Sequence, residues 1–329
     1  MNVHVIATGG TISSHFDGHD WTNLSGRALI DELGDPIVPG VEQADVTVED
    51  VATGPSSNLT TADMIAIAQQ VRLALAEGAD GVVVIHGTDT MDLTAFTAQL
   101  LLGTSADRRP VVFTGSMRVH SHPQPDGPAN LRDAIAAASS EAAVGRDVLV
   151  CMEGVLHAAD RVVKHHAASV DAFHSAPLSA VGRVSAGAVE ITAASPPRTP
   201  ATAFADSVPL VTGYPDIDAD EVAARLDGAA GAVVEGFGDL NVPQQLWLPI
   251  HTAWQRGALV VLASRPFTPT TTNDGLALLG VVGAGDLTAQ KARLAVMAAL
   301  GTEADREAAV AFLHQYALVH DTADRGTSA

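Results

Sequence analysis

Hydroxyl side chains stand directly after several strand-like apolar runs of this 329-residue chain. Thr11 follows VHVIATGG, Ser56 and Ser57 follow DVTVEDVATGP, and Thr88 and Asp89 follow GVVVIHG. A threonine or serine hydroxyl is a weak nucleophile that needs a neighbouring base before it can attack a carbonyl carbon. The pattern predicts a pocket for nucleophilic chemistry, provided that the strand ends meet at one edge of a sheet.

Lysine occurs only at Lys164 and Lys291, which narrows the choice of a base. The 18 basic residues therefore include 16 arginines (18 minus 2). Arginine keeps its proton in proteins, whereas a lysine can lose it where its surroundings lower its pKa. Lys164 lies in AADRVVKHH, after the strand-like run DVLVCME, and so within reach of the same edge. We interpret it as a candidate base; on position alone, the alternative is an ordinary surface lysine.

The elements that must position these residues alternate between β-rich runs and helical patterns in the first half of the chain. The clearest helix is expected over 60–78, with a threonine cap and a terminal glycine, and a second over 127–143. Such alternation predicts parallel strands joined by right-handed crossovers in a sheet covered on both faces. Ligands bind beyond the carboxyl ends of such strands, so the hydroxyls above, together with Ser116, are expected at one edge.

A Pro-, Ala- and Thr-rich stretch separates this half from a second alternation of strands and helices. Strands are expected at VPLVTGY, GAVVEGFG and GALVVLASR, and helices near 218–227, 243–256, 288–300 and 303–317. We predict a catalytic α/β domain over 1–190, an exposed linker over 191–207 and a smaller α/β domain over 208–329.

Charge and composition limit the possible partners. The net charge is −20, with 38 acidic and 18 basic residues and no basic cluster, so nucleic acid and anionic membranes would be repelled. No apolar run approaches the ~20 residues of a membrane span, and Met1 leads directly into a strand. We expect a cytoplasmic protein with a small-molecule substrate.

Metal and nucleotide sites are disfavoured by the motifs present. Cys151 is the single cysteine and is expected in a buried strand, while the His120/His122 and His165/His166 pairs lack further ligands at suitable spacing. ATGGTISSHFDG fits neither the dinucleotide fingerprint nor the P-loop. What remains at Gly10 is a corner without a side chain, which lets a substrate approach the backbone.

Several stretches resemble the bacterial-type L-asparaginases of the asparaginase/glutaminase family. ATGGTIS, HGTDTM, TGSMR with DGPANL, and DRVVKHHAASVDAFHS are similar to its signature regions and lysine segment. EGFGDLNVP, ASRPFTPTTT and TAQKARLAVMAALG resemble its smaller C-terminal domain. The resemblance therefore covers essentially the whole chain. It implies a two-domain α/β fold, with a larger, mostly parallel N-terminal sheet flanked by helices and a smaller parallel C-terminal domain.

The resemblance also implies roles for individual residues. Thr11 matches the primary nucleophile, and Thr88, Asp89 and Lys164 match a triad on the other side of the substrate. The carboxamide of L-asparagine would then be attacked by Thr11, with the oxyanion held by backbone N–H groups near Thr88. Ammonia leaves an acyl-enzyme, and water activated on the Thr88 side releases aspartate, without metal or organic cofactor.

Substrate binding and assembly are implied in the same way. Ser56 and Ser57 match the pair that holds the α-carboxylate and the ammonium of the amino acid, and Asp89 pairs with that ammonium. The resemblance implies a homotetramer built of dimers, in which Asn241 of one subunit completes a neighbour's site.

One departure from the family concerns the lid after the nucleophile. The family places a tyrosine there, but residues 14–35 contain none, and the two tyrosines are Tyr214 and Tyr316. His15 or His19 is a possible substitute, because imidazole titrates near neutrality. The acidic residue expected in the C-terminal domain has one weak candidate, Asp274. An amidohydrolase acting on glutamine, D-asparagine or another amide, or an amino-acid-binding protein without turnover, remains an alternative.

Overall fold

The computed structural model describes residues 1–38, 45–51, 54–175, 177–238, 240–266, 276 and 280–317. The chain divides into two compact units, Met1–Pro200 (unit 1) and Ala201–Ala329 (unit 2). The boundary falls inside the predicted linker 191–207, although Arg198 within that stretch is buried. Each unit has a hydrophobic core cluster of its own.

Unit 1 contains twelve strands and four α-helices among its described residues. The strands are β1 (Asn2–Ala7), β2 (Ser14–Phe16), β3 (Trp21–Asn23), β4 (Asp45–Asp50), β5 (Gly81–Ile85), β6 (Val111–Thr114), β7 (Leu149–Met152), β8 (Val155–Ala158), β9 (Val163–Lys164), β10 (Phe173–His174), β11 (Gly182–Ser185) and β12 (Ala188–Ile191). The helices are α1 (Gly26–Asp31), α2 (Thr61–Ala76), α3 (Met91–Leu102) and α4 (Gly127–Ala138), with short 3-10 turns η1 (Thr11–Ser13), η2 (Ser56–Asn58) and η3 (Glu141–Ala143).

Eight strands form the main sheet in the order β12-β11-β8-β7-β6-β5-β1-β4. The pairs from β4 to β7 are parallel, and β7, β8, β11 and β12 are joined by antiparallel pairs. The central strands β5, β6 and β7 are buried at every position, as expected for a sheet covered on both faces. Cys151 lies in β7 and is fully buried, as predicted.

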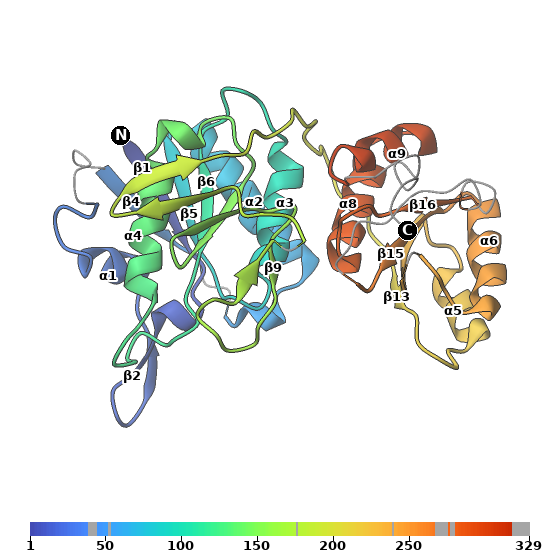
Figure 1. Cartoon of the computed structure of the whole chain (residues 1–329), viewed down its shortest axis with the longest axis horizontal. Coiled ribbons are helices and arrows are strands. Elements are labelled where there is room, and N and C mark those ends of the chain that lie inside the picture. Colours follow the sequence, from blue (N-terminus) through green and yellow to red (C-terminus); the bar gives the residue numbers. More distant parts are fainter. Residues whose placement is uncertain are drawn as a thin grey trace, which may run out of the picture. The chain divides into compact units, whose positions relative to one another are not determined.

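Helices cover the sheet through buried side chains, which lie along one side of α2 but occupy nearly every position of α3. α1 and α4 share the core cluster that contains Val83 and Ile85 of β5. α2 and α3 pack against each other and against the sheet (Figure 1). α2 begins with a capping box in which Thr60 and Asp63 satisfy each other's backbone N–H groups, which fixes where the predicted helix starts.

Two small hairpins lie outside the main sheet. β2 pairs with β3, and this hairpin extends away from the sheet at the lower left of Figure 1. β9 pairs with β10 in a second two-stranded sheet, with Phe173 opposite Lys164. We call them the lid hairpin (residues 14–23) and the lysine hairpin (residues 163–174). Both carry side chains of the site described below.

Unit 2 is a four-stranded parallel sheet with the order β13-β14-β15-β16. Its described elements are β13 (Leu210–Thr212), α5 (Ala219–Leu226), β14 (Gly231–Gly236), η4 (Gln244–Leu246), α6 (Trp247–Gln255), β15 (Leu259–Ser264), β16 (Val281–Gly283), α8 (Ala289–Thr302) and α9 (Arg306–His314). The prediction of a mostly parallel N-terminal sheet and a smaller parallel C-terminal one is therefore confirmed. Within the described residues, no helix has the length and apolar character that a membrane span requires.

Candidate active site

A cavity of about 750 Å³ opens in unit 1 where β1, β4 and β5 end. Its wall includes the carboxyl-terminal residues of these strands, Ala7, Asp50 and Ile85. The lining side chains and backbone that bear on the chemistry are those of Gly10, Thr11, Ser14, Asn23, Ser56, Thr88, Asp89 and Lys164. The parallel strands thus bring hydroxyls from distant parts of the chain to one place, as the sequence predicts.

The corner before Thr11 requires glycine. Gly10 has a φ of 100°, and a Cβ atom there would lie 2.6 Å from the Cα of Gly87. Two loops of the cavity therefore pack backbone against backbone. The Ser13 hydroxyl donates to the Gly10 carbonyl over 2.9 Å. This bond fixes the turn that presents Thr11 to the cavity.

Ser56 organises the turn that carries Thr88 and Asp89. Its Oγ accepts a hydrogen bond from the Asp89 backbone N–H at 3.2 Å, and its carbonyl accepts one from the Thr90 hydroxyl at 2.9 Å. Because the Ser56 oxygen is used as an acceptor, its hydroxyl hydrogen is left to donate to an anionic group in the cavity. The geometry therefore suits a substrate carboxylate beside Ser56.

Lys164 joins the two residues of that turn. Its Nζ lies 2.9 Å from Thr88 Oγ1 and 2.7 Å from Asp89 Oδ1. The Lys164 side chain is 16% exposed, but that of Asp89 is 59% exposed, so solvent screens the ion pair and it adds little to stability. Its consequence is positional: the amine is held within proton-transfer reach of the Thr88 hydroxyl.

A buried histidine, His86, precedes this turn and hydrogen-bonds to its backbone. His86 is fully buried, and its Nδ1–H donates to the Gly87 carbonyl at 2.7 Å. Burial lowers the pKa of His86 to about 4, because the charged imidazolium is poorly solvated there; the bond to Gly87 acts in the opposite direction. His86 is therefore neutral at physiological pH. His86 begins the HGTDTM motif, but the sequence alone assigned it no role.

The lid hairpin forms the wall beside Thr11. Ser14 Oγ lies 3.2 Å from the Gly10 carbonyl and 3.3 Å from Asn23 Oδ1, so both ends of the hairpin face the cavity. Neighbouring residues on a strand point to opposite sides. His15 accordingly lies against His120, with ring centroids 5.7 Å apart and the rings tilted by 49°, and does not line the cavity.

His19 lies at the exposed turn of the hairpin and is also absent from the cavity lining. The predicted substitutes for the lid tyrosine are therefore not brought to Thr11. The residues that line this wall are instead Ser14, Asn23, Leu24 and Ser25. Tyr214 and Tyr316 belong to unit 2.

Several residues of the predicted site lie elsewhere. Ser57 is exposed and does not line the cavity, and the Ser116 hydroxyl is buried and donates to the Arg118 carbonyl at 2.7 Å. Asn241 lies in unit 2, where its amide donates to the Gly238 carbonyl at 2.7 Å. Asp274 lies outside the described residues.

Asp50 is the main cavity residue that sequence reasoning missed. It ends β4, directly opposite Ala7 of β1, and its carboxylate accepts from the Gly26 N–H at 2.6 Å. Its place at the end of a predicted strand was a usable signal. In the described part of the chain, no group of three or more His, Cys, Asp or Glu residues has an arrangement suited to a metal ion.

Fold and cavity together define a two-unit α/β protein whose site combines hydroxyl side chains with a lysine and carboxylates. The family model described as "Asparaginase, N-terminal" matches residues 2–197, and that of the "Glutaminase/Asparaginase C-terminal domain" matches residues 207–313. The chain therefore belongs to the asparaginase family.

Named relatives agree with this assignment. A probable L-asparaginase of Deinococcus radiodurans is 35% identical, over 92% of this chain and 94% of that protein. L-asparaginase 2 of Escherichia coli is 28% identical, over 96% of this chain and 93% of that protein. The crystal structure of a probable cytoplasmic L-asparaginase from Campylobacter jejuni matches with a TM-score of 0.84 and 29% identity, over 96% of this chain and 99% of that one.

Proposed function

We propose that this protein is an L-asparaginase, which hydrolyses L-asparagine to L-aspartate and ammonia. The observation that carries the proposal is the contact of Lys164 Nζ with both Thr88 and Asp89 in a cavity that Thr11 also lines. A protein that only binds an amino acid has little need of a lysine held against a hydroxyl. Relatives named L-asparaginase over nearly the full chain support the same activity.

Thr11 is the nucleophile in this proposal. Its hydroxyl attacks the carboxamide carbon, and the tetrahedral intermediate collapses to an acyl-enzyme and ammonia. Among the described lining residues, the ionisable side chains are those of Asp50, Asp89 and Lys164. We therefore assign proton removal from Thr11 to this set rather than to a lid side chain. Water activated by Thr88 and Lys164 then releases aspartate.

The charged ends of the amino acid find complementary groups in the same cavity. The Ser56 hydroxyl donates to the α-carboxylate, and the Asp89 carboxylate accepts from the ammonium, because a zwitterion leaves water only where both charges are paired. Ser57, which does not line the cavity, has no role in this proposal. The expectation that Gly10 leaves room for the substrate is wrong, because the backbone of Gly87 occupies the space that a side chain at Gly10 would fill.

Assembly and location complete the proposal. We assign the protein to the cytoplasm, as the name of the Campylobacter jejuni structure suggests by analogy. We further propose a homotetramer of dimers, in which Asn241 of one subunit contributes to the site of its neighbour. Light scattering on the purified chain tests the assembly.

The experiment is ammonia release from the purified protein with L-asparagine, D-asparagine and L-glutamine, for the wild type and Thr11→Ala. We expect turnover with a preference for L-asparagine, and a loss of at least about 10³-fold in kcat for Thr11→Ala with an unchanged fold. Activity retained in Thr11→Ala would transfer the nucleophile to Thr88. Saturable binding of asparagine without ammonia release would instead identify a binding protein.

A further inference from the structure

The lysine hairpin stands outside the main sheet, so contacts other than sheet hydrogen bonds must fix its place. Two buried polar residues flank it. Asp160 is 4% exposed and lies shortly before β9, and Ser175 is 5% exposed and directly follows β10. Each has a buried partner, and these contacts hold the two ends of the hairpin.

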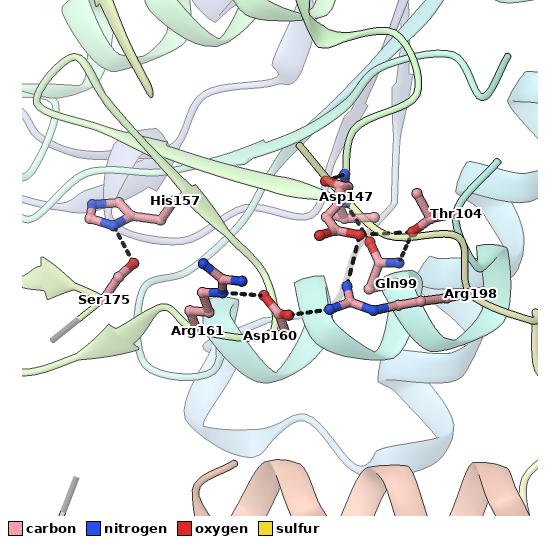
Figure 2. Close-up of polar contacts among 10 residues, drawn as sticks. Gln99, Thr104, Asp147, His157, Asp160, Arg161, Ser175 and Arg198 are labelled. Carbon is pink, nitrogen blue, oxygen red and sulfur yellow. Dashed lines mark hydrogen bonds and ion pairs between the residues drawn. The ribbon is translucent and has the colours of Figure 1, made fainter. Parts of the chain in front are cut away.

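Asp160 is held by the guanidinium of Arg198. Arg198 Nη2 lies 2.6 Å from Asp160 Oδ2, and Arg198 Nη1 lies 2.8 Å from Asp147 Oδ1, with the arginine side chain 1% exposed (Figure 2). Arg161 lies 3.8 Å from the other oxygen of Asp160. The negative charges of the two carboxylates are therefore balanced by the positive charges of the two guanidinium groups. A buried pair of this kind resists displacement, because separating the partners leaves an uncompensated charge.

Arg198 is itself a fixed point of unit 1. Its backbone exchanges hydrogen bonds with Thr104, at 2.9 and 3.1 Å. The Thr104 hydroxyl donates to Asp147 at 2.7 Å, which closes the network. Asp147 and Asp160 thus share one anchored guanidinium, but only Asp160 lies next to the lysine hairpin.

The other end of the hairpin is tied to the main sheet. His157 belongs to β8, and its Nδ1 lies 2.8 Å from Ser175 Oγ, with both residues buried (Figure 2). The hairpin is therefore held at its entry by an ion pair and at its exit by a hydrogen bond. Neither contact touches the cavity lining.

We propose that Asp160, held by Arg198, and Ser175, held by His157, are positioning residues for Lys164. The inference rests on the proposed function, since it gives Lys164 a role in proton transfer. Lys164 meets Thr88 and Asp89 at hydrogen-bond distance, and a displacement of about 1 Å in a catalytic group can cost about 100-fold in rate. A shift of the hairpin would lower kcat without removing any residue that binds substrate.

The test compares Asp160→Asn with the matched control Asp147→Asn. Both changes neutralise one of the two carboxylates that contact the Arg198 guanidinium, so both lower the melting temperature. We expect Asp160→Asn to reduce kcat for L-asparagine by about 100-fold with KM within about twofold of the wild type. Asp147→Asn should keep kcat within about twofold. Equal losses of kcat in the two variants would overturn the proposal and identify a purely structural network.

A second readout does not depend on activity. The chain has two lysines, and Lys291 is fully buried, so ¹⁵Nζ-lysine labelling gives a simple spectrum in which Lys164→Gln identifies the Lys164 signal. We expect this signal to move in Asp160→Asn and to stay in place in Asp147→Asn. If the wild type releases no ammonia from any amide, the proposed function fails, and the NMR comparison alone decides the positioning role.

Ser175→Ala covers the case in which Asp160→Asn does not fold, because it removes a hydroxyl group and no charged side chain. Its control is Ser195→Ala, which removes the hydroxyl that accepts from the Asp147 N–H at 2.8 Å. We expect Ser175→Ala to lower kcat by about tenfold and to move the Lys164 signal, with Ser195→Ala near the wild type. A Ser175→Ala protein with unchanged kcat and an unmoved signal would overturn this half of the proposal.

Discussion

At the scale of residues, the cavity depends on side chains whose neighbours use up part of their hydrogen-bonding capacity. Ser56 accepts from Asp89, which leaves its hydroxyl to donate, and Lys164 divides its contacts between Thr88 and Asp89. Ordinary residue types acquire distinct chemical roles in this way. In His86 one ring nitrogen, Nδ1, bonds to the Gly87 carbonyl, and the other, Nε2, is buried without a hydrogen-bond partner among the described atoms.

The buried His86 predicts a stability that depends on pH. Its pKa is lowered to about 4 in the folded protein, against an ordinary value of 6.5. Between pH 4 and pH 6.5, the unfolded chain therefore binds a proton at His86 that the folded protein does not bind. The free energy of unfolding is therefore unaffected by His86 above pH 6.5 and falls by about 3 kcal/mol as the pH is lowered to 4. Urea unfolding at pH 7 and at pH 5 should show about 2 kcal/mol of this difference.

His86→Gln is the control for this prediction. The variant lacks the titrating ring, so its free energy of unfolding should fall less steeply between pH 7 and pH 5 than that of the wild type. Parallel pH profiles for the two proteins would show that His86 takes up its proton without disturbing the fold.

The functional residues of the cavity were predictable where they follow the end of a predicted strand. Thr11, Ser56, Thr88 and Asp89 follow apolar runs, and the rule that parallel strands share a carboxyl edge brings them together. Ser14 and Asn23 were not predictable, because they reach the cavity through a hairpin of three-residue strands with no apolar periodicity. The side to which His15 points depends on pairing register, which the sequence alone does not specify.

At the scale of elements, the long buried strands and capped helices matched their sequence patterns, and the short hairpins did not. β5 and α2 each carry a continuous signal, an apolar run and a capped amphipathic pattern. The lysine hairpin has two-residue strands, and its place comes from Asp160 and Ser175 rather than from local propensity. Tertiary contacts override local preference in such segments.

The lid hairpin provides the element-scale prediction. It is braced by the His120 N–H, which donates to the Ser14 carbonyl at 2.8 Å, and by the Ser121 hydroxyl, which accepts from the Phe16 N–H at 3.0 Å. Replacing residues 14–23 with a short glycine linker should raise KM for L-asparagine by about tenfold or more, because Ser14 and Asn23 are lost from the wall of the cavity. The melting temperature should change little, since the hairpin adds no strand to the main sheet.

Steady-state kinetics and a thermal melt of the same preparation provide the measurement. A hairpin variant with the wild-type KM would show that Ser14 and Asn23 are dispensable for substrate binding. A large loss of melting temperature would instead assign the hairpin to the folding core.

At the scale of the whole molecule, the two units have separate cores. One core cluster spans Val3 to Val184 and the other spans Val211 to Val281, with no shared members. Each unit also has its own sheet. Such an arrangement is typical of domains that fold independently.

A fragment of residues 201–329 should therefore fold alone, with a helical circular-dichroism spectrum and a cooperative thermal transition. The reason is that β13 to β16 and their covering helices bury an apolar core without help from unit 1. A featureless spectrum, or a melt without a transition, would contradict the independence of the two units.

The scarcity of lysine has a practical consequence for attaching this protein to a support. Among the side-chain amines, an amine-reactive resin or polymer finds only one that is partly exposed, that of Lys164. Lys291 is fully buried. Coupling through side-chain amines would thus modify the cavity itself.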